Sequence, residues 1–419
     1  MTNINTKTER AILCGLSAAC FAPGESSTDV SMDELWALVE TAGGEPVAML
    51  MQHRAAPDPR SFIGEGKEQE LKALAEANEC TLAVFDNELS PSQMRVLSED
   101  LHMKVLDRSG LILDIFAQRA RTREGKLQVE LAQYKYLLPR LLGMWTHLER
   151  QEGAIGTRGP GETQVESDRR HIRRKIQKLE AELAEVRKNR ATQRRRREKR
   201  EMPMVALVGY TNAGKSTLLN RLTGSDIPAN DRLFDTLDTT TRRWQVDEVQ
   251  EVLLSDTVGF IRKLPTHLIE AFKATLEELA YADVLLHVID LSSPEWQTQA
   301  QVVDALIAQL GAEGTPCIRV YNKCDLYSGL LPRERDAVCI SARSGEGTED
   351  LRKAVERALG RSKRRAVFLL PFDKGALLET LHREAAVLST EYTDRGTRVE
   401  AIVKAELWPK LRDYAEARP

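Results

Sequence analysis

The chain has 419 residues, of which 42% are hydrophobic and 29% charged, a composition typical of globular proteins and sufficient for about two to four domains. No apolar run is long enough to span a bilayer, and the first residues lack the charged and then apolar build of a signal peptide. These features argue against an integral membrane protein and a secreted protein, and we expect a cytoplasmic one. Six cysteines without CxxC spacing argue against a disulfide framework and a zinc site, so we expect buried, reduced thiols.

The formal net charge is only -3, but the charge is unevenly distributed. Residues 166–200 contain 15 Lys and Arg against 6 Asp and Glu, a surplus of +9, so the rest of the chain carries -12. A basic segment in an otherwise acidic chain indicates a local element that binds a polyanion.

Residues 1–120 alternate short apolar runs with amphipathic stretches, as in TLAVFD followed by SPSQMRVLSEDL. This alternation predicts a small parallel α/β domain. The tetrapeptide GEGK at 64–67 opens one of its helices and is interpreted as a plain helix start rather than as a second phosphate site. Whether this domain binds a nucleotide or RNA stays open.

Residues 121–200 contain two stripes of apolar residues at heptad spacing, which we call seams. They predict two antiparallel helices that pack against each other along these seams. The seam residues are Leu127, Leu131, Tyr134, Leu138, Leu141, Trp145 and Leu148 in the first helix, and Ile172, Ile176, Leu179, Leu183 and Val186 in the second. Pro139 predicts a kink, and the glycine-rich stretch 153–163 predicts a non-helical tip roughly 35 Å from the base at about 1.5 Å per residue. The alternative is an ordinary helical hairpin packed against the body of the protein, with a flexible turn.

The second helix carries the basic surplus, with a run of arginines from 194 to 197. Such a run is commonly a solvated face or a site for acidic lipid, but the seam already uses the apolar side of the hairpin. Few aromatic residues are interleaved, so the segment favours backbone and shape recognition of structured RNA. The candidate RNA-binding residues are Arg158, Arg169, Arg170, Arg173, Arg174, Arg194, Arg195, Arg196 and Arg197.

An apolar run at 205–208 leads directly into GYTNAGKS at 209–216, which matches GxxxxGK[ST] without a mismatch. This strand, loop and helix order predicts a phosphate-binding loop, in which backbone NH groups and Lys215 bind phosphate oxygens and Ser216 binds Mg2+. DTVG at 256–259 supplies the DxxG motif, in which Asp256 reaches the metal ion and the Gly259 NH reaches the γ-phosphate.

NKCD at 322–325 supplies the motif that selects the base. The carboxylate of Asp325 accepts hydrogen bonds from the N1 and 2-amino edge of guanine, an edge on which adenine has no donors, so the site favours GTP over ATP. The candidate GTP-binding residues are Gly209, Tyr210, Thr211, Asn212, Ala213, Gly214, Lys215, Ser216, Thr217, Asp256, Thr257, Val258, Gly259, Asn322, Lys323, Asp325, Ser341, Ala342 and Arg343. The candidate Mg2+ ligands are Ser216, Thr240 and Asp256, and the candidate catalytic residues are Lys215, Thr240 and Gly259.

Phe260 follows the DxxG motif, where well-studied small G proteins have a glutamine that orients the attacking water. We therefore expect slow hydrolysis of GTP by the protein alone. Asn212 resembles an asparagine that holds a potassium ion in some GTPases, so K+ is a candidate second cofactor. After about residue 363 we expect a small C-terminal α/β domain with a helix over 374–390 and no catalytic residues.

The chain resembles the HflX family of ribosome-associated GTPases over nearly its whole length. The resemblance rests on FIGEGK, FDNELSPSQ, DRSGLILDIFAQRARTREGKLQVELAQ, YLLPRL, GTRGPGETQVESDRR, GYTNAGKSTLLN, DTVGFIRKLP and AFKATLEE. It implies binding to the large ribosomal subunit and its RNA, hydrolysis stimulated by the ribosome, and splitting of stalled ribosomes under heat or antibiotic stress. It also implies that the hairpin tip approaches the peptidyl transferase region. ATP binding or RNA unwinding by the N-terminal domain is credited to some relatives.

Two residues depart from the family pattern. Thr239 stands where the family commonly has proline, so the metal ligand is Thr239, Thr240 or Thr241, and Thr240 is the residue chosen here. Tyr134 replaces a usual leucine of the seam. The expected architecture is α/β, with an N-terminal domain at 1–120, a helical hairpin at 121–200, a doubly wound P-loop GTPase domain at 201–362 and a C-terminal α/β domain at 363–419.

Three functions are compatible with the sequence. The leading hypothesis is a GTP-dependent ribosome-splitting factor, and the alternatives are a GTP-gated assembly factor for the large subunit and a signalling switch with a protein or membrane partner. The two seams satisfy each other within one chain, which favours a monomer.

Overall fold

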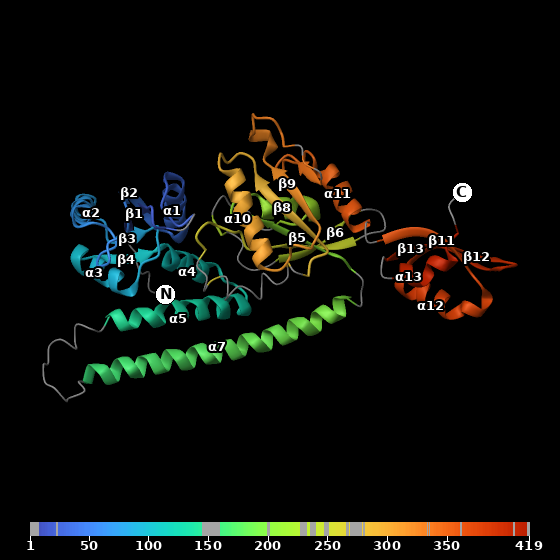
Figure 1. Cartoon of the computed structure of the whole chain (residues 1–419), viewed down its shortest axis with the longest axis horizontal. Helices are drawn as coiled ribbons and strands as arrows, with labels where there is room; N and C mark the ends of the chain where they lie inside the picture. Colours follow the sequence, from blue (N-terminus) through green and yellow to red (C-terminus); the bar gives the residue numbers. More distant parts are fainter. Residues whose placement is uncertain are drawn as a thin grey trace.

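The computed structural model describes residues 8–21, 24–144, 160–198, 202–226, 233–234, 240–246, 251–264, 268, 279, 281–332, 334, 336–360, 363–404 and 407–416. Figure 1 shows an N-terminal α/β unit, a pair of long helices, a central α/β unit and a small C-terminal unit. The predicted α/β class is confirmed. Within the described residues, no helix has both the length and the apolar character needed to cross a membrane.

The N-terminal unit is built on a four-stranded parallel sheet in the order β2-β1-β3-β4, as the alternating pattern predicts. The strands are β1 (Arg10–Ala18), β2 (Glu45–Arg54), β3 (Leu82–Phe85) and β4 (Lys104–Asp107). The helices are α1 (Asp29–Ala42), α2 (Glu65–Ala77), α3 (Pro91–Leu101) and α4 (Arg108–Arg119). Gly64 is the N-cap of α2 and Lys67 pairs with Glu70 at 2.8 Å, which agrees with a plain helix start at this tetrapeptide.

The hairpin consists of α5 (Arg123–Met144) and α7 (Pro160–Glu198). Leu127, Leu131, Leu179 and Leu183 are buried against one another, with Tyr134, Ile176 and Val186 partly buried beside them, which confirms this part of the predicted seam. Leu138, Leu141 and Ile172 do not belong to the cluster. Two charge pairs flank it, Lys175 with Glu130 at 3.2 Å and Lys135 with Glu180 at 3.0 Å. Because α7 begins at Pro160, the expected non-helical stretch is wrong for residues 160–163: proline is favoured in the first turn of a helix, where its missing NH costs nothing. The rest of the expected tip, with Arg158, and the predicted seam residues Trp145 and Leu148 lie outside the described residues.

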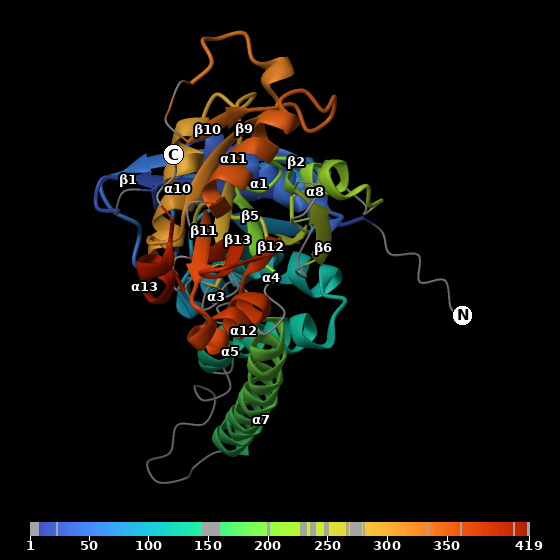
Figure 2. The same cartoon turned by 90° about the vertical axis from the view of Figure 1, so that its right-hand side faces the viewer.

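The opposite face of α5 packs on the N-terminal unit. Val129, Ala132 and Tyr136 belong to the same buried cluster as residues of α4, and Arg140 donates to Asp107 at 2.8 Å. Only α7 therefore lies outside the body, and Figure 2 shows it projecting away from the sheets. Pro139 lies inside α5, and the kink expected there stays a prediction.

The central unit has a six-stranded sheet in the order β10-β9-β8-β5-β7-β6, parallel except for β6. Alternate residues of β5 face opposite sides, since Val205 and Leu207 pack with α8 and α11 whereas Ala206 and Val208 pack with α10. This two-sided cover is the predicted doubly wound arrangement. The strands are β5 (Met204–Gly209), β6 (Thr240–Gln245), β7 (Glu251–Asp256), β8 (Val284–Asp290), β9 (Cys317–Asn322) and β10 (Ala337–Cys339), and the helices are α8 (Lys215–Thr223), α10 (Trp296–Gln309) and α11 (Thr348–Gly360).

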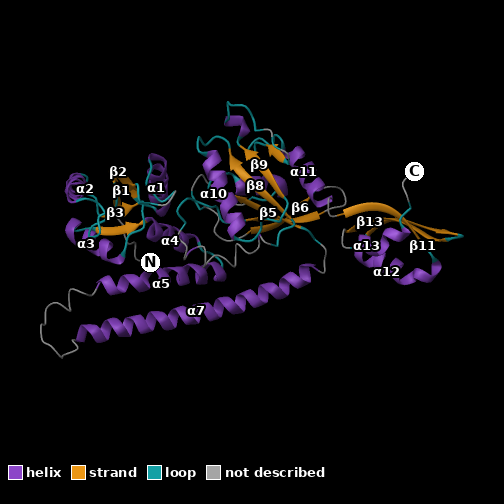
Figure 3. Cartoon of the chain, viewed as in Figure 1, coloured by secondary structure: helices purple, strands orange, loops and turns teal. Residues whose placement is uncertain are grey.

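The C-terminal unit is a three-stranded antiparallel sheet in the order β11-β13-β12 with helices on one side (Figure 3). Its elements are β11 (Lys363–Leu370), α12 (Gly375–Glu384), β12 (Ala386–Thr393), β13 (Gly396–Lys404) and α13 (Trp408–Leu411). The helix expected over 374–390 is wrong beyond Glu384. Pairing of β12 with β13 overrides the local helical pattern there, because tertiary contacts outweigh intrinsic propensity.

The expectation of buried thiols holds only in part. Cys14 is buried, but Cys20 and Cys317 are exposed, and Cys80, Cys324 and Cys339 are half-buried. All six are free cysteines. The apolar residues beside them in the sequence did not indicate which of the six are exposed in the folded protein.

Candidate nucleotide site

The phosphate-binding loop joins the carboxyl end of β5 to the first turn of α8, as the motif predicts. Glycine is required at both glycine positions of the motif for steric reasons. A Cβ atom at Gly209 would lie 2.3 Å from the carbonyl oxygen of Val288, and one at Gly214 would lie 2.3 Å from Nδ2 of Asn322. Gly214 also has a φ of 89°, which L side chains rarely adopt. The loop is therefore packed directly on the carboxyl-terminal residues of β8 and β9.

Lys215 is the buried cation of this loop, with a side chain only 6% exposed. Its Nζ donates to the carbonyl oxygens of Tyr210 at 2.7 Å and Gly209 at 3.2 Å. Burial lowers the pKa of Lys215 to about 8, although the carboxylate of Asp256 opposes the shift. Among the described residues no carboxylate forms an ion pair with Lys215, so a bound phosphate would supply the negative charge that this ammonium group favours.

Ser216 and Asp256 come together from α8 and the end of β7. The hydroxyl of Ser216 donates to Oδ2 of Asp256 at 2.7 Å. Thr240 at the start of β6 is the register partner of Asp256, whereas Thr241 is the partner of Ser255 and its hydroxyl lies 3.3 Å from that of Ser255. Since neighbouring residues of a strand face opposite sides, Thr240 rather than Thr241 shares the side of Asp256. Two hydroxyls and a carboxylate fit the oxygen ligands that Mg2+ prefers. Thr239 lies outside the described residues.

The DxxG segment lies directly against the phosphate-binding loop. A Cβ atom at Gly259 would lie 2.9 Å from Cα of Thr211 and 3.1 Å from Nζ of Lys215, so the backbone approaches the lysine as no larger residue would allow. The following residue fixes this approach: the Phe260 NH donates to the Gly209 carbonyl at 3.1 Å, and its carbonyl accepts from the Thr211 NH at 2.7 Å. Thr257 is buried and donates to the Leu207 carbonyl at 2.7 Å.

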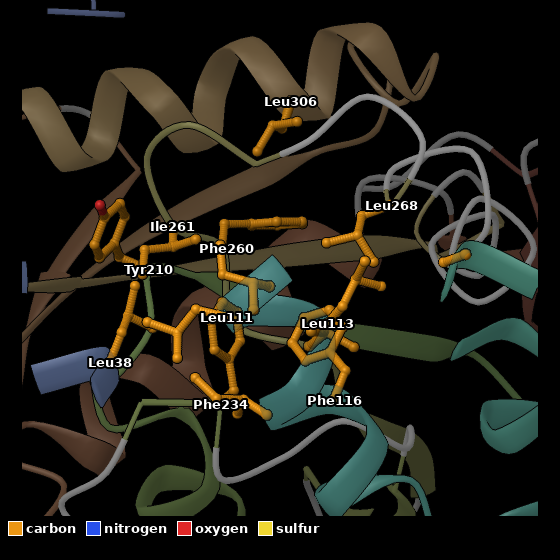
Figure 4. Close-up of a cluster of buried hydrophobic side chains, with 14 of the residues drawn as sticks. Leu38, Leu111, Leu113, Phe116, Tyr210, Phe234, Phe260, Ile261, Leu268 and Leu306 are labelled. Carbon is orange, nitrogen blue, oxygen red and sulfur yellow. The ribbon is translucent and has the colours of Figure 1, made fainter. Parts of the chain in front are cut away.

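The side chain of Phe260 belongs to a hydrophobic core and is only 2% exposed. Figure 4 shows it among labelled residues of the N-terminal unit, including Leu111 and Phe116, and of the central unit, including Leu306. Residues of α1, α4, α10 and the loop segments thus form one buried cluster. Phe260 cannot position a water molecule by hydrogen bonding, and its place in the chain serves packing between the two units.

Asn322 connects three segments of the site. Its Nδ2 donates to the Ala213 carbonyl at 2.8 Å, and its Oδ1 accepts from the Ala342 NH at 2.9 Å. Lys323 has a φ of 61° and its Nζ lies 2.7 Å from Oδ2 of Asp290, while Asp325 is exposed and available to accept hydrogen bonds. Ser341 is buried beside this motif, and Arg343, also next to it, has an exposed side chain. The structure therefore brings the loop, NKxD and Ser341–Ala342 segments together.

Tyr210 has a different environment from the one its place in the motif predicts. Its backbone carbonyl faces Lys215, but its side chain points into the junction between the N-terminal and central units. The hydroxyl donates to Oε1 of Glu34 at 2.6 Å and accepts from the NH of Arg262 at 2.8 Å. No pattern in the sequence points to Glu34, because it precedes Tyr210 by 176 residues and belongs to no motif.

A buried charge cluster surrounds this contact. Arg108 pairs with Glu34 and, at 2.8 Å, with Asp86, whose other oxygen lies 2.5 Å from Nζ of Lys263. Burial opposes the ionisation of Asp86, but Arg108 and Lys263 outweigh it and hold its pKa below the usual range. Burial lowers the pKa of Lys263, and Asp86 opposes that shift. We call Glu34, Asp86, Arg108 and Lys263 the junction cluster.

The predicted RNA-binding residues other than Arg158, which lies outside the described residues, belong to α7. Arg170, Arg173 and Arg174 are exposed, and Arg169 is half-buried and lies 3.5 Å from Glu166. Residues 194–197 are helical and belong to the last turns of α7. Figure 1 shows α7 running beneath the N-terminal unit toward the central one, so one straight element carries these arginines. At about 1.5 Å per residue its 39 residues span roughly 58 Å.

Three family models match consecutive parts of the chain. Residues 29–117 match the GTP-binding GTPase N-terminal region, residues 119–197 the GTP-binding GTPase middle region, and residues 204–323 a model described as a 50S ribosome-binding GTPase.

Curated relatives named GTPase HflX resemble the chain over most of its length. The protein of Caldanaerobacter subterraneus subsp. tengcongensis is 46% identical and covers 97% of this chain and 94% of its own, and that of Escherichia coli K12 is 45% identical with 91% of each chain covered. Among solved structures, a GTP-binding protein from the archaeon Sulfolobus solfataricus in complex with GDP is 26% identical, with a TM-score of 0.45 over 84% of this chain and 99% of that one.

Proposed function

Because this chain belongs to the HflX family of GTPases, we propose that it is a GTP-hydrolysing factor that binds the large ribosomal subunit and splits or rescues stalled ribosomes. The observation that carries the nucleotide part of this proposal is the convergence of Lys215, Ser216–Asp256 and Asn322 around one loop. The ribosomal part is supported by the basic face of α7 and by the ribosome-binding GTPase model that matches residues 204–323.

In the proposed nucleotide complex, Lys215 and the backbone NH groups of the loop bind the phosphates. Ser216, Thr240 and Asp256 would hold Mg2+, which bridges phosphate oxygens and offsets the charge that develops on them. The Gly259 NH would bind the γ-phosphate, since its backbone already approaches Lys215 without a side chain in between. Asp325 would select guanine, with Asn322 holding the NKxD segment against the loop.

Hydrolysis is proposed to be slow until the ribosome completes the site. The support is Phe260, which is buried in the core where a water-positioning glutamine would otherwise stand. A ribosomal element, or an ordered switch around Thr240, would then orient the attacking water. GTP would stabilise the conformer that binds the ribosome, and hydrolysis would release the protein.

Asn212 supports a proposal that potassium assists this reaction. The residue has a φ of 61° within the phosphate-binding loop, a conformation that asparagine tolerates better than most residues. We expect faster GTP turnover in potassium than in sodium at equal ionic strength, measured as phosphate release. An Asn212→Ala variant should lose the difference, and equal rates of the unmodified protein in the two salts would contradict this role.

The deciding experiment is sedimentation of intact ribosomes through a sucrose gradient after incubation with the protein and a non-hydrolysable GTP analogue, GDP or no nucleotide. We expect separate subunits only with the GTP analogue, with the protein on the large subunit. Lys215→Ala should abolish the effect, because the loop loses its phosphate-binding cation. If ribosomes stay intact while the protein binds only free large subunits, it is an assembly factor instead.

The contribution of α7 is tested by the salt dependence of ribosome binding. Arg173→Gln combined with Arg174→Gln should lower the slope of log affinity against log salt by roughly one for each lost phosphate contact. The matched control replaces Lys353 and Arg357, exposed on α11, with glutamine. Equal slopes for the two variants would show that these arginines of α7 make no phosphate contacts with the ribosome. Binding that increases with the negative charge of lipid vesicles would instead favour the signalling alternative. A cytoplasmic location, a monomeric state and a role in heat or antibiotic stress complete the proposal.

A further inference from the structure

Two half-buried cysteines that the nucleotide site does not use lie beside the guanine-selecting segments. Cys324 stands between Lys323 and Asp325 in the short 3-10 turn Cys324–Leu326, and Cys339 ends β10 two residues before Ser341. Both pack against the small apolar cluster that contains Tyr321. One cysteine therefore belongs to the NKxD segment, and the other directly precedes the Ile340–Ala342 stretch that contacts this segment.

The backbone keeps the two residues adjacent. Cys339 is the register partner of Tyr321 in the parallel β9–β10 ladder, and the Cys324 NH donates to the carbonyl of Ile340 at 3.2 Å. The Sγ atom of Cys324 lies 3.1 Å from the Tyr321 carbonyl oxygen, and Cys324 and Cys339 pack against the same apolar cluster. Tyr321 lies about 5 Å from Cys339 across the ladder, and Cys324 follows Tyr321 by three residues, so the 3-10 turn begins beside the end of β10.

We propose that Cys324 and Cys339 form a reversible disulfide that weakens the binding of guanine nucleotides. This inference rests on the guanine site proposed above, and it assigns to that site a redox modification. The edge position of β10 in the sheet favours access by a small oxidant and leaves the strand room to move.

The reaction balances with hydrogen peroxide as the oxidant. The sulfur of Cys339 attacks one peroxide oxygen, the O–O bond breaks, and a sulfenic acid and one water molecule form. The sulfur of Cys324 then attacks the sulfenic sulfur, the S–O bond breaks, and the hydroxyl leaves as a second water molecule. Two thiols are oxidised by two electrons in total, and a thiol reductant reverses the change.

Cys339 is the better first nucleophile of the two. Burial raises the pKa of Cys324 to about 12, with contributions from Cys339 and from the carboxylate of Glu346. Burial also raises the pKa of Cys339, but the neighbouring thiol of Cys324 lowers it in part. Because the thiolate is the reactive form, oxidation should be slow and should report sustained exposure to peroxide.

The effect on the nucleotide follows from the short S–S bond. Its length of about 2.05 Å is well below the separation of two sulfur atoms that are not covalently bonded, so closing it moves the 3-10 turn and the end of β10 toward each other. Asp325 is the next residue in the turn, and Ala342 donates its NH to Asn322 three residues after Cys339. A shift of this kind misaligns the groups that hydrogen-bond the base, and a displacement of about 1 Å is enough to weaken such a site considerably.

The test oxidises the full chain with hydrogen peroxide, quenches it, and locates the cross-link by mass spectrometry of alkylated peptides. Dissociation of fluorescently labelled GDP is then measured for the oxidised, reduced and re-reduced protein. We expect a peptide pair joining Cys324 to Cys339 and a dissociation rate about tenfold higher after oxidation, reversed by dithiothreitol. Absence of the pair, or an unchanged rate with the pair present, would overturn the proposal.

Matched variants separate this site from the remaining thiols. Cys339→Ser should bind GDP normally when reduced and lose the response to peroxide, whereas Cys20→Ser, at an exposed cysteine of the N-terminal unit, should keep it. A response that persists in Cys339→Ser would also overturn the proposal. Failure of the reduced protein to bind labelled GDP would instead count against the guanine site, while the mass spectrum still decides whether the disulfide forms.

Discussion

At the scale of single residues, the protonation state of Lys215 should make the affinity for GDP depend on pH. Its pKa is lowered to about 8 in the free protein, and a bound polyphosphate favours the charged form. Affinity for GDP should therefore be nearly constant below pH 7 and fall above pH 8, by at most about tenfold per pH unit. Binding titrations with labelled GDP between pH 6.5 and 9 measure this. Lys215→Arg stays charged over this range, so its affinity, lower overall, should show no such fall.

Two glycines with positive φ, one inside the phosphate-binding loop and one outside it, allow a controlled comparison of Gly→Ala substitutions. Gly214 and Gly224 have φ of 89° and 66°, so Gly→Ala imposes a backbone cost of about 1 kcal/mol on each. Only at Gly214 does the added methyl group meet Asn322, at 2.3 Å, whereas nothing lies within 4 Å of the position at Gly224. Gly214→Ala should lower GDP affinity by at least about 100-fold and Gly224→Ala by less than about threefold. Similar losses in both variants, measured by GDP titration, would show that the contact with Asn322 is unimportant.

At the scale of elements, the seam between α5 and α7 determines whether the long helix keeps its direction. Leu183 is buried in the seam, and replacing it with alanine should cost about 2 to 5 kcal/mol of local stability. Because α7 is held mainly through this seam, amide hydrogen exchange of its residues should rise, and ribosome binding should weaken with it. Leu137→Ala is the control, since Leu137 lies on α5 with 43% of its side chain exposed. Equal exchange in both variants would contradict a role for the seam.

At the scale of the whole molecule, the junction cluster joins the N-terminal unit to the segment after DxxG. Asp86 is completely buried and pairs with both Arg108 and Lys263, so Asp86→Ala leaves two buried cations with only Glu34 and should cost about 3 to 5 kcal/mol. Lys263→Met should cost less, because Asp86 keeps Arg108 and two serine hydroxyls as partners. Urea unfolding of the intact chain measures both values.

The control for the junction cluster is Lys104→Met. Lys104 forms an exposed pair with Glu9 at 3.4 Å, and loss of such a pair should change stability by less than about 1 kcal/mol. A cost for Lys263→Met that exceeds the cost for Asp86→Ala would contradict the charge balance inferred for the cluster.

The sequence by itself determined the fold class, the seam leucines and the segments of the nucleotide site. These features depend on residues that are close together in the sequence or spaced at regular intervals. Eight consecutive residues form the phosphate-binding loop, and heptad spacing places Leu179 and Leu183 on one side of a helix. The boundaries at Pro160 and Glu384 were missed because neighbouring strands and helix-end preferences, not periodicity, decide where those helices begin and end.

Only the tertiary structure decided what the side chains of Tyr210 and Phe260 contact and which cysteines are neighbours. Tyr210 hydrogen-bonds Glu34, Phe260 enters a core shared with α4, and Cys324 and Cys339 pack against one cluster. Each contact joins residues whose separation in the sequence carries no periodic signal. Such contacts form because the packing of separate sheets and helices buries apolar surface and the attached polar groups must then find partners.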